Sequence, residues 1–197
     1  MLDYKIPHTS QEKEVEVKRS RFLAFIKHTK GSDQAKTFIQ DLRSAYPDAR
    51  HHCHAFIAGS PNNSNLYGFS DDGEPNGTAG MPIFTHLKHS GLGEATIVVV
   101  RYFGGTKLGT GGLAKAYGEA AKQVLLDLPT VTHVSMEEFD IELSFAQEAT
   151  IRKAIEEVNG AIINVEYSNL VKLRVSVPQT SNFELPYSVQ RLPTSTI

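Results

Sequence analysis

The sequence predicts an α+β protein of two domains. Strand-like and helix-like hydrophobic patterns alternate through the first 130 residues, the pattern changes around Thr130–Glu137, and a β-α-β-β order follows. The chain has 197 residues, which suits two domains of ordinary size better than one. We therefore expect an N-terminal α/β domain over residues 1–130 and a C-terminal domain over residues 136–197.

The N-terminal domain is expected to begin with two strands, a helix and a third strand. In KEVEVKRSRFLAFIKH an alternating pattern gives way to an apolar run, which predicts two strands joined by a bend at Lys18–Ser20. The next segment has apolar residues at helical spacing, with Ser32 as a candidate N-cap and Pro47 as its end. HHCHAFIAG then predicts a strand that ends at Gly59.

The rest of this domain predicts a long loop, a short helix, a buried strand and a longer helix. SPNNSNLYGFSDDGEPNG is dense in turn-forming residues, and Thr78 after it is a candidate cap for a short helix through Ile83–Leu87. EATIVVVRYF is continuously apolar, as expected for a strand that is covered on both faces. A helix from Leu113 ends at Pro129.

The C-terminal domain has the strand and helix order of a ferredoxin-like unit. FDIELSF, AIINVEY and LVKLRVSV predict strands, and QEATIRKAIEEVNG predicts a helix that ends at Asn159-Gly160. This is the first three-quarters of such a unit. The remaining helix and strand would fall in the tail, where Pro186 and Pro193 disfavour both, so we expect a degenerate or partly disordered end.

The composition predicts a cytoplasmic protein. Hydrophobic residues make up 40% and charged residues 21%, which is ordinary for a globular chain, and a single cysteine excludes an intramolecular disulfide. The N-terminus lacks the apolar core of a secretory signal, and no apolar run approaches the ~20 residues of a membrane span. The net charge is +2 over residues 1–136 and −4 over residues 137–197, so any contact with nucleic acid must be a local patch.

The stretch VVVRYFGGTKLGTGGLAKAYGEA combines a strand, a glycine-rich loop and a helix. Free backbone N–H groups at a helix start, together with Arg101 and Lys107, would form an anion site. A Walker phosphate loop is excluded because Gly109 is followed by Thr110 and not by lysine. GTGGLA fits the string of a dinucleotide fingerprint but lacks its βαβ context. The alternative is that the glycines allow close packing of strand, turn and helix.

The stretch GFSDDGEPNGTAG places Asp71, Asp72 and Glu74 beside Gly77 and Thr78. Three carboxylates could hold Mg²⁺ or Ca²⁺, but no known ligand spacing is present, so turn formation near a helix start is the favoured explanation. If the two glycine-containing loops meet, their acids and bases could neutralise one another or hold a phosphate through a metal. We predict no metal and no cofactor.

Two further stretches contain residue types that form sites in other proteins. In RHHCH, His52 and His54 share one face of the strand while His51 and Cys53 share the other, so neither a zinc site nor a Cys–His nucleophile is expected. LVKLRVSV has a partly basic face without the aromatic rings that RNA-binding sheets use for stacking. We expect that face to be solvated.

Three motifs together resemble the IMPACT family, in its bacterial YigZ branch. They are ARHHCHAFIAG, GFSDDGEPNGTAGMPI and VVVRYFGGTKLGTGGLAKAYGEA, and the resemblance is dense from about Val15 to Gln123. The second domain is similar to that branch's C-terminal ferredoxin-like domain, which resembles domain V of elongation factor G. The tail after Pro178 departs from the regular helix-plus-strand ending.

This resemblance implies a two-layer α/β N-terminal domain with the left-handed βαβ fold found in a small-subunit ribosomal protein, in elongation factor G domain IV and in GHMP kinases. It also implies a role near translation. Eukaryotic members compete for the activator of a stress kinase, and for bacterial members RNA or ribosome binding is inferred from fold kinship. Carried over by motif, the contact surface comprises Arg50, His51, Asp71, Asp72, Glu74, Gly77, Thr78, Arg101, Tyr102, Gly104, Gly105, Lys107, Gly109, Gly111, Gly112 and Lys115.

The sequence thus predicts a cytoplasmic protein, without contact to membranes, that binds RNA or the ribosome with modest affinity and modulates translation without catalysis. Two alternatives stay open at this point. One is a metal-dependent enzyme that acts on a phosphate-bearing ligand, and the other is a module that binds a protein partner.

Overall fold

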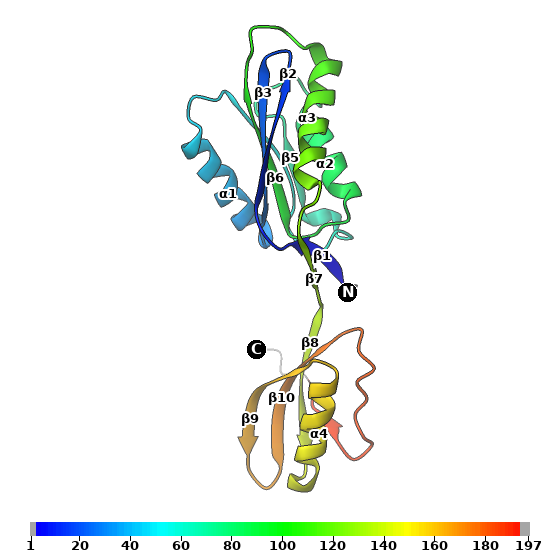
Figure 1. Ribbon diagram of the computed structural model, residues 1–197. Coiled ribbons are helices and arrows are strands. Elements are labelled where there is room, and N and C mark those ends of the chain that lie inside the picture. Colours follow the sequence, from blue (N-terminus) through cyan, green and yellow to red (C-terminus); the bar gives the residue numbers. More distant parts are fainter. Residues whose placement is uncertain (1–2, 194–197) are drawn as a thin grey trace. The chain divides into compact units, whose positions relative to one another are not determined.

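The computed structural model describes residues 3–193 and divides them into two units. The first unit spans residues 4–133, and the second spans residues 134–193 together with Asp3. Both units contain helices packed on antiparallel sheets, so the predicted α+β class is confirmed (Figure 1).

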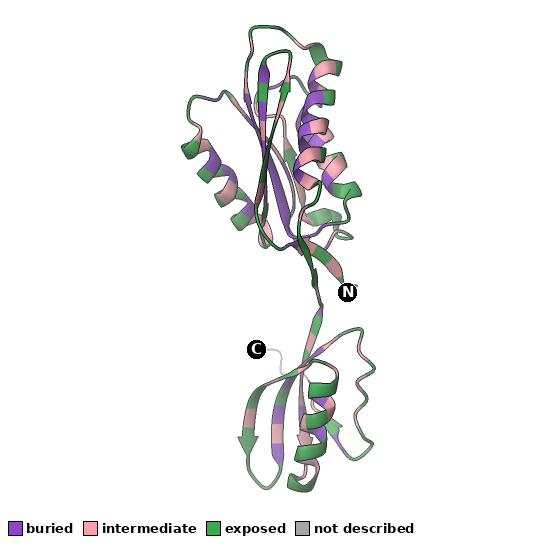
Figure 2. Cartoon of the chain, in the orientation of Figure 1, coloured by how far each residue is buried: buried purple, intermediate pink, exposed green. Residues whose placement is uncertain are grey.

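An antiparallel sheet of five strands, in the order β2-β3-β6-β4-β5, forms the centre of residues 4–133 (Figure 1). All residues of the central strand except its last are buried, as the continuous apolar run predicted (Figure 2). Lys18 and Arg19 form the tight turn between β2 and β3 at φ 48° and 67°. The strands are β2 (Gln11–Val17), β3 (Ser20–His28), β4 (His51–Ile57), β5 (Tyr67–Ser70) and β6 (Ala95–Tyr102).

Helices cover both faces of this sheet. Helix α1 (Gly31–Ala45) packs on one face, and α2 (Gly80–His89) and α3 (Gly109–Leu125) pack on the other, where they bury the larger core (Figure 1). The expected two-layer arrangement therefore describes one side of the sheet, and α1 adds a third layer. In the described part of the chain, none of the helices is long and apolar enough to cross a membrane.

Two predicted helix caps are wrong. The N-cap position of α1 is Lys30 and not Ser32, because the helix begins two residues earlier than the cap signal indicates. The Thr78 hydroxyl donates to the carbonyl of Pro75 at 2.6 Å, and the first N–H groups of α2 are instead bound by the distant carboxylate of Asp71.

Short elements account for most of the remaining differences. The predicted long loop contains the 3₁₀ turn η1 (Ser64–Leu66) and strand β5, and β1 (Tyr4–Pro7) pairs with β7 (Thr130–His133) near the end of the first unit. Each of these strands has four residues. Such segments are too short to show a period-two pattern, so sequence periodicity cannot detect them.

The second unit has the strand order of a ferredoxin-like fold. Its sheet runs β11-β8-β10-β9, so the last strand lies beside the first. Up to residue 193, the tail after β10 contains no second helix, and Phe183 and Leu185 pack against the core in its place. The expected degenerate end stays a prediction, and residues 194–197 of the tail lie outside the described residues. The elements are β8 (Met136–Leu143), α4 (Phe145–Glu157), β9 (Ala161–Tyr167), β10 (Val171–Pro178) and β11 (Gln190–Arg191).

Candidate functional site

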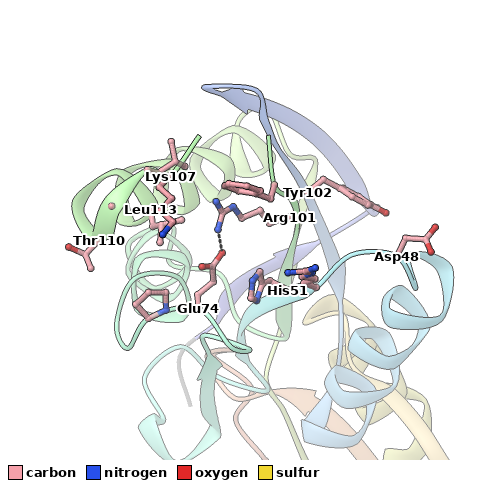
Figure 3. A pocket seen from close by; sticks show the side chains of 13 residues that line it. Asp48, His51, Glu74, Arg101, Tyr102, Lys107, Thr110 and Leu113 are labelled. Atoms are coloured by element: carbon pink, nitrogen blue, oxygen red, sulfur yellow. Dashed lines mark hydrogen bonds and ion pairs between the residues drawn. The ribbon is translucent and has the colours of Figure 1, made fainter. Parts of the chain in front are cut away.

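A cavity of about 740 Å³ lies in the first unit where β6 ends and β4 begins (Figure 3). Its walls come from these strand ends, the loop before α2, the loop after β6 and the first turn of α3. The lining residues are Asp48, Arg50, His51, Glu74, Pro75, Arg101, Tyr102, Phe103, Lys107, Leu108, Gly109, Thr110 and Leu113.

The pairing of two strands brings the motifs together. Strands β4 and β6 are antiparallel, and their register places His51 opposite Arg101. The start of one strand therefore meets the end of the other, and paired positions lie on the same face of the sheet. Residues that are 50 positions apart in the sequence become neighbours at one edge of the sheet.

Arg101 is buried at the floor of the cavity and is already paired. Its Nη1 donates to Glu74 Oε1 at 2.6 Å (Figure 3). The hydroxyl of Tyr117 donates to the same oxygen at 2.8 Å. Burial raises the pKa of Tyr117, so its phenol remains a donor at neutral pH. The guanidinium lies over the rings of Phe22 and Phe103, 5.6 and 5.7 Å from their centroids. Arg101 is thus a structural part of the floor and not the free cation that the sequence suggested.

Asp71 organises the start of α2. Its carboxylate accepts the backbone N–H groups of Gly77, Ala79 and Gly80 at 2.8, 2.9 and 2.8 Å. Burial of the carboxyl would raise its pKa, but these three hydrogen bonds outweigh burial and hold the pKa of Asp71 below its ordinary value.

Asp72 joins the same loop to α1 and β4. Its carboxylate accepts from the guanidinium of Arg43 and from the backbone N–H of His52. These groups outweigh burial and lower the pKa of Asp72. The Asp72 carbonyl accepts from Nδ1 of His51 at 2.8 Å, so that ring nitrogen carries the proton.

The three acidic side chains of this loop therefore have separate protein partners. Within residues 3–193, no group of three or more His, Cys, Asp or Glu side chains is placed to hold a metal ion. Of the two roles considered for the loop, this arrangement favours the neutralising structural network over a metal-bridged phosphate.

The two aspartates predict a stability that depends on pH. Because their pKa values are lower in the folded chain than in the unfolded one, their contribution is fully present above the unfolded pKa of about 3.9 and is lost as the pH falls through the folded values. Asp71→Asn/Asp72→Asn should lower stability near pH 7 by roughly 1 kcal/mol or more per lost set of hydrogen bonds. The double variant should also show a free energy of unfolding that changes less with pH as the pH falls through the pKa values of the two aspartates.

Urea unfolding at a series of pH values tests this prediction. The control Asp41→Asn/Asp127→Asn removes two exposed carboxylates elsewhere in the same unit. Its free energy of unfolding should change with pH as steeply as that of the unaltered protein. An equal slope in both variants would contradict the assignment.

Two cations at the cavity are available for a ligand. Arg50 and Lys107 are exposed, and neither makes a hydrogen bond or an ion pair with any residue between 3 and 193. Asp48 is the acid that also lines the rim, while Glu74 is neutralised by Arg101. The accessible part of the cavity therefore carries a small positive excess.

Aromatic rings stand beside these cations. Phe103 is 59% exposed, and Tyr102 is partly exposed. Phe103 is not among the site residues predicted from the sequence, because it continues the apolar run of β6. The strand ends at Tyr102, however, so the next side chain leaves the core.

The glycines serve different purposes at different positions. Helix α3 begins at Gly109, so the run GTGG forms its first turn and not the predicted loop. A Cβ at Gly104 would lie 2.0 Å from the backbone carbon of Arg19, so this glycine is needed for packing. A Cβ at Gly111 would meet no atom within 4 Å among the described residues, so packing does not explain that glycine.

The predicted site residues fall into three groups. Those that line the cavity are Arg50, His51, Glu74, Arg101, Tyr102, Lys107 and Gly109. Those that flank it on the β6–α3 connection or on α3 are Gly104, Gly105, Gly111, Gly112 and Lys115. Those that belong to the hydrogen-bonded loop before α2 are Asp71, Asp72, Gly77 and Thr78.

The outer face of the second unit has few free cations. Lys172 lies opposite Glu142, and Arg174 lies opposite Asp140 and bonds Glu138 at 3.3 Å. Because acids surround both basic residues, this face fits the expected solvated surface better than an RNA platform.

Comparison with known proteins places the chain in a family. The Impact N-terminal domain model matches residues 18–125. The chain is 47% identical to "IMPACT family member YigZ" of Escherichia coli over 83% of this chain and 80% of that protein, and 37% identical to an "IMPACT family member" of Haemophilus influenzae over 91% and 87%. A solved structure titled "Crystal structure of an hypothetical protein" is 45% identical, with a TM-score of 0.72 over 90% of this chain and 86% of that one. The chain therefore belongs to the IMPACT family, in the branch that contains YigZ.

Proposed function

We propose that the protein binds RNA through the cavity of its first unit, acts at the ribosome and modulates translation without catalysing a reaction. The observation that carries this proposal is that Arg50 and Lys107, which have no partner among residues 3–193, line one cavity together with the exposed ring of Phe103. Cations for phosphates and an aromatic face for bases are the two elements that proteins combine to bind RNA.

The backbone adds to the attraction for phosphate. The N-cap residue of α3 is Leu108, whose side chain cannot accept a hydrogen bond, so among the described residues no side-chain cap covers the first turn. The N–H groups of this turn carry the positive end of the helix dipole and lie at the cavity wall.

Charge sets the expected strength of binding. The chain carries a net charge of −2, and the cavity offers only a few cations. Binding should therefore be modest, with a salt dependence that corresponds to a few phosphates at ~0.7–0.9 per neutralised charge.

The proposal of the ribosome as the place of action is supported by the family resemblance, which implies a role near translation. The absence of catalysis is supported by the chemistry of the loops, since all three carboxylates are bound by protein groups. Burial raises the pKa of Cys53, which keeps its thiol protonated and unsuited to act as a nucleophile.

The variant Arg50→Ala/Lys107→Ala tests the proposal. Titration onto ribosomes and onto a structured RNA should show affinity reduced by at least about tenfold, because two charge-assisted contacts to phosphate are lost. The slope of log affinity against log salt should become shallower by about 1.4–1.8. Both side chains are exposed and unpaired among the described residues, so folding should be unaffected.

The matched control is Lys36→Ala/Lys122→Ala, which removes the same charge from exposed positions on α1 and α3 away from the cavity. It should bind like the unaltered protein. Equal losses in both double variants would show that only total charge matters. The proposal is refuted if the unaltered protein binds neither the ribosomes nor the structured RNA.

A further inference from the structure

We propose that the cavity accepts one unstacked nucleotide of single-stranded RNA, with its base stacked on Phe103 and its phosphate held by Lys107 and the start of α3. This inference rests on the proposed function and specifies its ligand. A cavity of about 740 Å³ lies within the ~300–1,000 Å³ typical of small-ligand sites, so it can enclose a single nucleotide. The paired bases of a duplex have their faces covered by their neighbours and present only edges and backbone.

Phe103 is built as a stacking platform. The buried guanidinium of Arg101 lies over one face of its ring, and Phe22 supports Arg101 from the core side. Glu74 fixes the guanidinium from a third direction. An exposed ring in a flexible loop would lose conformational freedom on binding, but this ring is already supported, so less entropy is lost.

The cavity floor has hydrogen-bonding capacity that the protein does not use. Arg101 is more than nine-tenths buried, and within residues 3–193 its Nε has no acceptor. A guanidinium has five N–H donors, and Glu74 is its acceptor among the described groups. A ligand that brings acceptors to this floor, as a phosphate or the carbonyl edge of a base does, would accept a hydrogen bond from the unpartnered Nε of Arg101.

The backbone around the phosphate position is bare. Gly111 lies in the first turn of α3, and an added Cβ there would meet no described atom within 4 Å, whereas Gly109 is required by its φ of 72°. Glycine inside a helix costs about 1 kcal/mol relative to alanine. A cost without a packing benefit is explained if a ligand approaches the backbone closely at Gly111.

This geometry predicts preference for single strands with little choice of base, because every base has a π-face. The probes are a labelled ten-nucleotide oligo(U) and a ten-base-pair RNA duplex, titrated by fluorescence anisotropy. The unaltered protein should bind the single strand at least about tenfold more tightly than the duplex. Phe103→Leu should weaken binding of oligo(U) by roughly 5- to 150-fold without altering the salt slope, as the loss of one stacked base implies.

Two further variants separate stacking from general damage. Phe103→Tyr keeps a ring face and should retain binding of oligo(U). Phe69→Leu removes another exposed phenylalanine, 47% exposed on β5 and away from the cavity, and should bind like the unaltered protein. Thermal unfolding of each variant establishes that it is folded.

The inference is overturned if Phe103→Leu binds oligo(U) as the unaltered protein does, or if the duplex binds as tightly as the single strand. If, in that case, Arg50→Ala/Lys107→Ala still weakens ribosome binding, the proposed function stands and only the single-strand specificity fails. If neither RNA binds, both proposals fail.

Discussion

Replacing Glu74 with leucine should destabilise the first unit by about 3–5 kcal/mol, the usual cost of removing one partner of a buried ion pair. The substitution leaves the charge of Arg101, which is only 8% exposed, without its carboxylate. It also removes the acceptor of the Tyr117 hydroxyl. Urea unfolding at neutral pH measures the loss as a change in the free energy of unfolding.

The double variant Glu74→Leu/Arg101→Met separates the buried charge from other effects. Removing both charges should restore most of the stability, because apolar side chains of similar volume often replace a buried ion pair at little cost. A loss below about 1 kcal/mol in the single variant, or a double variant that is no more stable than the single one, would contradict the assignment. The same reasoning makes Arg101 unsuitable for tests of binding, since its removal would leave Glu74 buried and unpaired.

Gly104→Ala should destabilise the first unit by about 3 kcal/mol or more. The new Cβ would lie 2.0–2.3 Å from backbone atoms of Arg19 and Ser20, and overpacking against rigid backbone costs at least as much as the ~1–3 kcal/mol typical of cores. Gly104 also donates its N–H to the hydroxyl of Ser20 at 3.1 Å, so displacing the loop would break this bond. Thermal and urea unfolding both report the effect.

Gly111→Ala is the matched control for this substitution. It introduces the same methyl group at a helical position where no described atom lies within 4 Å, so it should leave stability unchanged or raise it by up to about 1 kcal/mol. Similar losses in the two variants would contradict the distinction between a glycine required by packing and a glycine left bare.

The fold could be predicted from the sequence where patterns were long. The continuous apolar run of β6 predicted a strand buried on both faces, and the period-two pattern of β10 predicted a strand buried on one face. Both strands lie where expected. The helix caps could not be predicted in the same way. Asp71 binds the first N–H groups of α2 from another loop, and no local cap signal encodes a partner that tertiary structure supplies.

The candidate site was only partly predictable for a related reason. The motifs contained Arg101 and Glu74, but their mutual pairing depends on how the loop before α2 folds over the end of β6. Lys107 and Arg101 carry the same charge in the sequence, and it is the fold that leaves Lys107 exposed while it buries Arg101 and pairs it with Glu74. Phe103 was missed because nothing in an apolar run marks the residue at which the chain leaves the sheet.

The most direct test of RNA binding at this cavity is to map where RNA touches the protein. Single-stranded RNA that carries a photoreactive uridine analogue would be cross-linked to the full chain, and the linked peptides would be identified by mass spectrometry. Binding at the cavity predicts cross-links within residues 101–113, centred on Phe103. Cross-links that concentrate on the second unit or on α1, with none in residues 101–113, would contradict it.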